Sequence, residues 1–238
     1  FRNEGISMKH NPEFTMLEWY EAYADYEKTA SDLEQLVHGV AVEVLGSSTI
    51  ERDGRTIDLT PPWRRVTLRD AILEHAGIDI EVETTREKLA AAMGVELESD
   101  VGWGKLVDTV FSKRVEPTLI EPTFILDYPK ELSPFAKAHR SKPGVVERWE
   151  AFLGGVEIAN SFSELNDPDE QRRRFEQQAE ELARGDDEAQ PYDESFIEAL
   201  EQGMPPTGGV GLGIDRLVMM LTGASSLREV VLFPAMRD

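Results

Sequence analysis

The chain has 238 residues, 40% of them hydrophobic, so it is long enough to bury the core of one large domain. Its net charge of −21 argues against a protein whose whole surface binds nucleic acid, because phosphates repel such a field. The absence of cysteine excludes disulfides and thiolate metal sites, which fits a reducing cytoplasm. No apolar run reaches the ~20 residues that cross a bilayer, so we expect no membrane contact.

The opening of the chain predicts a strand with an acid on one face. Residues 14–23 alternate, which puts Phe14, Met16, Glu18 and Tyr20 together on one side. We expect Glu18 to be buried there, and a buried carboxylate needs a partner. That partner is either a Lys or Arg of the chain or a bound cation.

Helical and turn signals follow this strand. Residues 25–45 have the spacing of an amphipathic helix, and Gly46 stands where its C-cap belongs. The pair Asp53-Gly54 between two short β-like runs predicts a hairpin with a tight turn. Residues 66–116 carry several helical patterns that stop at Gly or Pro, so we expect a small helical insertion with no obvious chemistry.

The second half of the chain returns to strands. Residues 121–129 form an apolar run between prolines, and residues 146–167 read as strand, Gly-Gly turn and strand. A helix is predicted over about residues 167–183, and the Gly-rich run at 207–213 leads into a last helix. Antiparallel pairs with helices between and after them predict an α+β fold, an antiparallel sheet flanked by helices.

The Gly-rich run fits neither common phosphate-binding motif. Its glycines stand at 208, 209, 211 and 213, which matches neither the dinucleotide fingerprint nor the P-loop. Glycines that alternate along a strand still leave one face bare, and a flat ring can lie against that backbone. Arg216, at the start of the next helix, could stack on such a ring; the alternative is a packed strand beside a surface Arg.

Three segments resemble one enzyme family. The run FRNEGISMKHNPEFTMLEWYEAY (1–23) closely resembles the second signature motif of class II aminoacyl-tRNA synthetases, and GGVGLGIDRLVMML (208–221) resembles the third. Between them, EIANSFSELND (157–167) is similar to a segment of the lysine-specific members. The resemblance covers essentially all of 1–238 and implies a catalytic domain whose start, with motif 1 and the anticodon-binding barrel, lies upstream of Phe1. We therefore expect residues 1–238 alone to be inactive.

The resemblance implies a two-step reaction. Lysine and ATP would give lysyl-adenylate and pyrophosphate, and the lysine would then pass to tRNA(Lys), in a cytoplasmic homodimer. Two alternatives stay open: a paralogue that passes lysine to a protein or lipid, and a non-catalytic module derived from the fold. The charged residues that the family pattern requires are all present, namely Arg2, Glu150, Glu157 and Arg216. This disfavours the non-catalytic module, because charges that are costly to keep in a site would then have no catalytic purpose.

The family pattern also implies roles for individual residues. Arg2 and Arg216 are the expected catalytic cations, because a guanidinium fork can bond two phosphate or carboxylate oxygens at once. The expected ATP contacts are Arg2, Glu4, His10, Asn11, Phe14, Glu157, Asn160 and Arg216. Without the family pattern, His10 would be predicted to be an exposed imidazole in a loop. Glu150 and Glu157 correspond to the Mg²⁺ ligands, and Mg²⁺ usually takes only one or two carboxylates besides water and phosphates.

The expected lysine contacts are Arg2, Glu18, Tyr20, Asn160, Phe162 and Glu164. An ammonium on an apolar stem needs an apolar tube that ends in carboxylate. Without substrate, the acids at 18 and 164 should repel, and one should tend to hold a proton. Glu157 has the opposite strand parity to Asn160, so both can face one site only through a bulge or strand end near Ala159.

Overall fold

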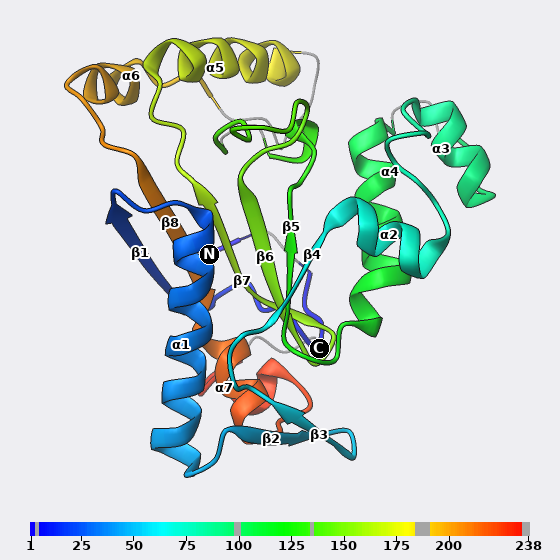
Figure 1. The fold of residues 1–238 in the computed structure, drawn as a ribbon, viewed down its shortest axis with the longest axis vertical. Helices are drawn as coiled ribbons and strands as arrows, with labels where there is room; N and C mark the ends of the chain where they lie inside the picture. The colour runs from blue at the N-terminus through cyan, green and yellow to red at the C-terminus, as the bar shows by residue number, and fades with distance from the viewer. Residues whose placement is uncertain (3–4, 98–100, 134–135, 184–190, 235–238) are drawn as a thin grey trace.

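A six-stranded sheet forms the centre of the computed structural model, which describes residues 1–2, 5–97, 101–133, 136–183 and 191–234 (Figure 1). The strand order is β1-β8-β7-β6-β5-β4. The strands are β1 (Met16–Ala22), β4 (Arg64–Thr67), β5 (Thr123–Leu126), β6 (Arg148–Leu153), β7 (Val156–Ser163) and β8 (Thr207–Gly213). Only β4 and β5 pair in parallel among these strands. The predicted α+β class is confirmed, with a mixed sheet.

Helices surround this sheet. Their bounds are α1 (Tyr26–Leu45), α2 (Leu68–Ala76), α3 (Arg86–Met93), α4 (Trp103–Val110), α5 (Pro168–Ala183), α6 (Glu194–Glu201) and α7 (Ile214–Thr222). A π-helical turn at Phe111–Val115 continues α4, and short 3₁₀ turns lie at Glu116–Thr118, Lys130–Leu132 and Leu227–Glu229. In Figure 1, α2, α3 and α4 gather beyond β4, whereas α5 and α6 lie across the top. Among the helices described, none is long and apolar enough to cross a membrane.

Local sequence signals account for the boundaries of α1. Asp25 accepts hydrogen bonds from the backbone N–H groups of Glu27 and Lys28, both at 3.1 Å, and so caps the N-terminus. Gly46 adopts the left-handed conformation, φ 68°, and its N–H bonds to the Val42 carbonyl. The helix predicted over 25–45 is therefore confirmed at both ends.

The two predicted tight turns are also present. β2 (Thr49–Arg52) and β3 (Arg55–Asp58) form a separate two-stranded hairpin, in which both turn residues have positive φ, as a primed turn requires. Gly154 and Gly155 do the same between β6 and β7, with φ values of 60° and 73°. Both hairpins thus place their strands as the sequence predicts.

Two hydrophobic clusters divide the molecule. The first joins α1, α7 and the β2–β3 hairpin to the sheet and includes the fully buried Leu33 and Trp149. The second packs α2, α3 and α4 on β5 and β6, with Ile72, Leu89 and Phe152 buried. The helices predicted over 66–116 are present, except that Val66 and Thr67 belong to β4. These helices form the crossover connection that the parallel strands β4 and β5 require.

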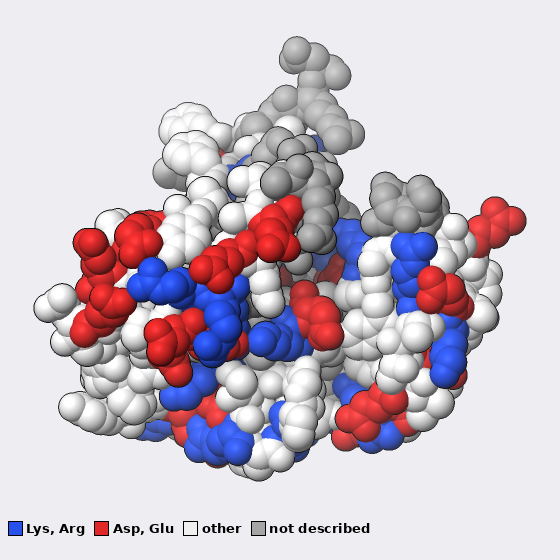
Figure 2. Space-filling model, turned by 90° about the horizontal axis from the view of Figure 1, so that it is seen from above, with Lys and Arg blue, Asp and Glu red and all other residues white. Residues whose placement is uncertain are grey.

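Charged side chains of both signs alternate on the surface around α5 and α6. Figure 2, seen from above, shows acidic and basic groups interspersed. Glu170 of α5, for example, accepts from Lys130 at 3.1 Å, Arg173 at 2.7 Å and Arg174 at 2.8 Å. These contacts stabilise the carboxylate and lower the pKa of Glu170 to about 2.

A β-bulge interrupts the β6–β7 pairing at the predicted place. Ala151 lies opposite Ala159, but the next residue, Phe152, lies opposite Glu157, so Ile158 is an extra residue on β7. The irregularity expected near Ala159 is therefore confirmed. It turns Glu157 toward the side of the sheet on which Asn160 lies, and both line the same cavity.

Candidate active site

One cavity of about 400 Å³ lies over β8, on the face of the sheet opposite α1. It is lined by every predicted site residue that the structure describes, namely Arg2, His10, Asn11, Phe14, Glu18, Tyr20, Glu150, Glu157, Asn160, Phe162, Glu164 and Arg216. Glu4 lies outside the described residues. The strands, the loop before β1 and the first turn of α7 thus bring together residues from both ends of the chain.

The floor of this cavity is a trough along β8, formed by Gly209, Gly211 and Gly213. Val210 and Leu212 alternate with these glycines and point into the core beneath. Tyr20 of β1 and Phe162 of β7 stand on either side of Gly209, and Glu18 and Asn160 stand on either side of Gly211. Because neighbouring strands lie ~4.8 Å apart, β1 and β7 flank a bare strip roughly 10 Å wide.

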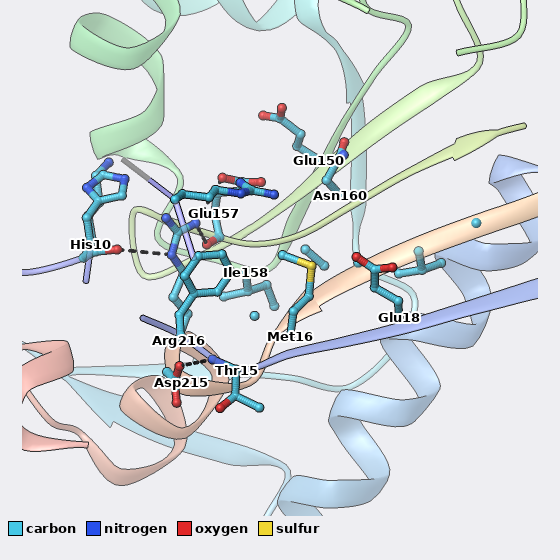
Figure 3. A pocket seen from close by; sticks show the side chains of 18 of the residues that line it. His10, Thr15, Met16, Glu18, Glu150, Glu157, Ile158, Asn160, Asp215 and Arg216 are labelled. Carbon is cyan, nitrogen blue, oxygen red and sulfur yellow. Dashed lines mark hydrogen bonds and ion pairs between the residues drawn. The ribbon is translucent and has the colours of Figure 1, made fainter. Parts of the chain in front are cut away.

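Cations and loop contacts gather at the Gly213 end of the trough (Figure 3). Arg216 donates from Nη1 to the Glu157 carbonyl at 2.7 Å and to the Glu157 carboxylate at 3.0 Å. Its Nε donates to the Lys9 carbonyl at 3.3 Å, and the Lys9 ammonium forms an ion pair with Glu116. We refer to this end as the cationic end. The charges of Arg216 and Lys9 are already paired with carboxylates of the protein.

The loop before β1 adds polar and aromatic groups to the cationic end. The Arg2 guanidinium lies 5.4 Å from the centre of the Phe14 ring, within range of a cation–π contact. Ser7 Oγ lies 2.9 Å from His10 Nδ1. Asn11 is buried, and although its amide donates to the Glu13 carbonyl, its Oδ1 has no hydrogen-bond partner among the residues that the structure describes. A buried acceptor without a partner is costly and is therefore available to a ligand.

Two acids lie toward the opposite end of the trough, Glu164 against Gly209 and Glu18 beside Gly211. Among the described residues, no Lys or Arg pairs with Glu18 or Glu164, so the internal salt bridge considered for Glu18 is not present. Burial raises the pKa of Glu164 to about 7, and repulsion from Glu18 adds to the rise. Burial and the same two carboxylates raise the pKa of the Tyr20 hydroxyl. We refer to this as the acidic end.

The expectation that Glu18 is buried is wrong. β1 is the edge strand of the described sheet and pairs only with β8, so Glu18 is exposed on its outer rim. Figure 3 shows its carboxylate separated from Arg216, with Met16 between them. Glu164 follows β7 in the interior of the sheet and is partly buried, so it carries the larger electrostatic cost.

Besides the cationic and acidic ends, a cluster of charged and polar side chains lies midway along β6 and β7. Tyr128 donates its hydroxyl to Glu150 Oε2 at 2.8 Å, and Arg148 forms an ion pair with the other carboxylate oxygen. Arg148 also donates from Nε to Asn160 Oδ1 at 2.9 Å. Burial raises the pKa of Glu150 to about 7; Arg148 opposes the rise and Glu157 adds to it.

Comparison with known families agrees with this arrangement. A family model described as tRNA synthetases class II (D, K and N) matches residues 1–237. The chain belongs to this family. As a class II synthetase chain, it carries its two signature segments side by side at one cavity, since one leads into β1 and the other forms the neighbouring strand β8 and then α7.

Three curated relatives of this synthetase chain are named lysine–tRNA ligase. The protein of Moorella thermoacetica is 54% identical over 240 residues, that of Thermosynechococcus vestitus 56% over 241, and that of Pelotomaculum thermopropionicum 52% over 242. Each alignment covers 100% of this chain but 48–49% of the relative. The chain thus spans about half the length of the curated relatives it matches.

The acids of this synthetase site fit a magnesium ion better than a metal held by many protein ligands. Within the described residues there is no cluster of three or more His, Asp or Glu side chains that could hold a metal. Glu150 and Glu157 line the same cavity; burial raises the pKa of Glu150, and repulsion from Glu157 adds to the rise. Two carboxylates at one cavity suit Mg²⁺, which usually takes only one or two carboxylates from a protein.

Sequence reasoning missed three residues of the synthetase site. Arg148 lies two positions before Glu150 and so shares its strand face, and this parity could have identified it. Asp215 accepts the backbone N–H of Thr15 at 2.7 Å and ties α7 to the strand after the loop. Lys9 had no signal beyond its place beside His10, because its partner Glu116 is more than a hundred residues away in the sequence.

Proposed function

We propose that this chain is the adenylate-forming part of a lysine–tRNA ligase. The observation that carries the proposal is the unpaired acidic end, where Glu164 is partly buried beside Tyr20 and Phe162. An ammonium on a long apolar stem fits this surrounding, because it supplies the missing cation and covers the rings. The names of the curated relatives support the same substrate.

The first step would join lysine to ATP at the middle of the trough. A lysine carboxylate oxygen forms a bond to the α-phosphorus, and the bond from that phosphorus to the leaving pyrophosphate breaks. With lysine's ammonium at Glu164, its carboxylate is directed toward the Gly213 end, where Phe14 and Arg216 can receive adenine. Arg2, which lies over Phe14, would contact the carboxylate and the α-phosphate together.

Charge on the phosphates has two sources of compensation in the proposed reaction. Arg2 and Arg216 supply guanidinium groups. Glu150 and Glu157 would hold Mg²⁺, which when bound neutralises the charge that develops as pyrophosphate leaves. Asn160, held by Arg148 through its Oδ1, can then present its amide nitrogen to the substrate. The Asn11 Oδ1 offers a buried acceptor for a donor group of the nucleotide.

The second step would transfer lysine from the adenylate to tRNA(Lys). A ribose hydroxyl of the tRNA attacks the lysyl carbonyl, and AMP leaves. We propose that the full-length protein acts in this way in the cytoplasm as a homodimer, and that residues 66–116 are an insertion in its catalytic domain. Sedimentation of the full-length protein would test the dimer.

Pyrophosphate exchange into ATP tests the first step directly. The full-length protein should catalyse exchange with lysine, and much more weakly with ornithine or norleucine. Ornithine lacks the matching length, and norleucine lacks the side-chain ammonium. Exchange that is absent, or equal for lysine and norleucine, would refute the proposal. Charging of tRNA(Lys) by the same preparation would then separate a tRNA ligase from an enzyme that passes lysine to another acceptor.

A further inference from the structure

Gly209 differs from the other glycines of the trough in what surrounds it. A Cβ added at Gly209 would overlap Glu164 Oε1 and lie 2.8 Å from Tyr20 Cε1 and 3.0 Å from Glu164 Cδ. Within 4 Å and among the described residues, a Cβ at Gly211 would meet only Met16 Sδ, at 3.3 Å, and the nearest atom to a Cβ at Gly213 is 3.5 Å away. The Glu164 carboxylate therefore occupies the space that a side chain at Gly209 would need.

Backbone conformation does not explain this glycine. Gly209 lies within β8 and is not among the residues with positive φ, so its backbone suits any L-amino acid. Its pairing partners Tyr20 and Phe162 are regular strand residues on either side. What the position requires is the absence of a side chain, which lets the Glu164 carboxylate lie against β8.

We propose that Gly209 is a specificity-determining residue for the amino-acid substrate. Its bare Cα leaves room for the Glu164 carboxylate against β8 and beside Tyr20, where a primary ammonium that enters the cavity can reach it. The class of ligand is an unbranched amino acid with a terminal ammonium. This inference rests on the proposed function and adds a residue that carries no charge and no hydrogen-bonding side chain.

The variant Gly209→Ala tests the inference through binding. The added methyl group displaces the Glu164 carboxylate, so the Kd for lysine, measured by calorimetry on the full-length protein, should rise about 10- to 100-fold. The Kd for ATP should change less than about twofold, since its proposed contacts lie at the other end of the trough. A lysine Kd within twofold of the wild type would overturn the inference.

A second substitution separates displacement of the acid from general damage. Glu164→Asp shortens the side chain by one methylene and withdraws the carboxylate from the space above Gly209. On its own it should weaken lysine binding, but in the Gly209→Ala background it should cost much less or restore affinity, because the overlap is relieved. Additive losses in the double variant would overturn the inference. If Gly209→Ala alone does not fold, recovery of a folded protein by adding Glu164→Asp supports the same overlap, and failure to recover it counts against the inference.

The neighbouring glycine provides a matched control. Gly208 faces the opposite side of the sheet, where an added Cβ would lie 2.6 Å from Thr29 Cγ2. Gly208→Ala should therefore lower the Tm while leaving the lysine Kd within about twofold, whereas a lysine-specific loss there would contradict the assignment to Gly209. Binding and exchange also separate the two proposals. Lysine binding that depends on Gly209 without lysine-dependent exchange would refute the ligase and uphold the inference, and wild-type protein that binds no lysine would refute both.

Discussion

The charged groups at the two ends of the trough are stabilised in different ways. At the cationic end, Arg216 is bonded to Glu157 and Lys9 to Glu116, so both of these cations have a carboxylate partner within the protein. At the acidic end, no described Lys or Arg pairs with Glu18 or Glu164. Where a partly buried carboxyl group has no cationic partner, burial raises its pKa, as at Glu164.

This difference indicates how each end would respond to its ligand. Anions that bind at the cationic end must compete with carboxylates already in place, which favours a ligand with several negative charges. A cation that binds at the acidic end displaces only a proton and water. The acidic end is therefore the part of the site where a single charge on the ligand has the largest effect.

Removing the charge of Glu164 should have the largest effect on the difference between the two ends of the trough. Glu164→Gln keeps the shape of the side chain but leaves a bound ammonium without its counter-charge, at a cost of about 2–4 kcal/mol in lysine binding. Lysine and ATP dependence of pyrophosphate exchange would measure it, and ATP should be nearly unaffected. The exposed Glu18 offers a matched control, since Glu18→Gln should cost less than about 1 kcal/mol. Equal weakening of lysine and ATP would contradict the assignment of Glu164.

Substituting Glu157 should change the cationic end instead. Glu157→Ala removes the carboxylate partner of Arg216 and one proposed Mg²⁺ ligand, so kcat for exchange should fall about 10- to 100-fold. The lysine Kd should change little, because the acidic end is intact. Added Mg²⁺ should restore part of the rate. An unchanged rate at limiting Mg²⁺ would show that Glu157 takes no part.

The pH dependence of lysine binding should distinguish the two ends further. Glu164 must ionise to bind an ammonium, and its pKa is about 7, so roughly a tenth of it is ionised at pH 6 and most at pH 8. The lysine Kd should fall by about tenfold between these values, with release of a proton that calorimetry in two buffers can detect. Glu164→Gln should remove this dependence. A flat wild-type profile would mean that the acidic end is already ionised at pH 6.

The smallest expected effect concerns stability without ligand. Because the pKa of Glu164 is higher in the folded protein than the ~4.3 of an unfolded chain, the folded state holds more protons between about pH 4.3 and 7. Stability is therefore lost as pH rises through 7, on the order of 1 kcal/mol after solvent screening. Glu164→Gln should raise the Tm relative to wild type by a few degrees at pH 8 and less at pH 5.5. The exposed Glu198→Gln is the control, and an equal shift from it would contradict the explanation.

Local features of the fold could be predicted from the sequence because they depend on short-range rules. The capping of α1 by Asp25 and Gly46 follows from adjacent residues. The bulge at Ile158 followed from strand parity combined with a requirement that Glu157 and Asn160 meet. In that case a functional expectation supplied the missing long-range information.

Long-range pairing could not be predicted in the same way. Nothing near Arg64–Thr67 indicates that this strand pairs in parallel with β5, about sixty residues later. The exposure of Glu18 depends on its position in an edge strand, which is a property of the assembled sheet. The Lys9–Glu116 ion pair likewise joins two segments that no local pattern relates.

The bulge at Ile158 decides where β7 can lose a residue. Because Ile158 is the extra residue, its deletion would leave Glu157 two positions from Asn160 and opposite Phe152 in a regular pairing, so both would still face the cavity. Outside the bulge, a deletion has the opposite result. Removal of one residue between Asn160 and Glu164 would exchange the two faces of the strand and turn one of these side chains away from the cavity. Natural or designed variants of this chain should therefore accept loss of Ile158, or insertions in the loops between helices, more readily than a gap between Asn160 and Glu164.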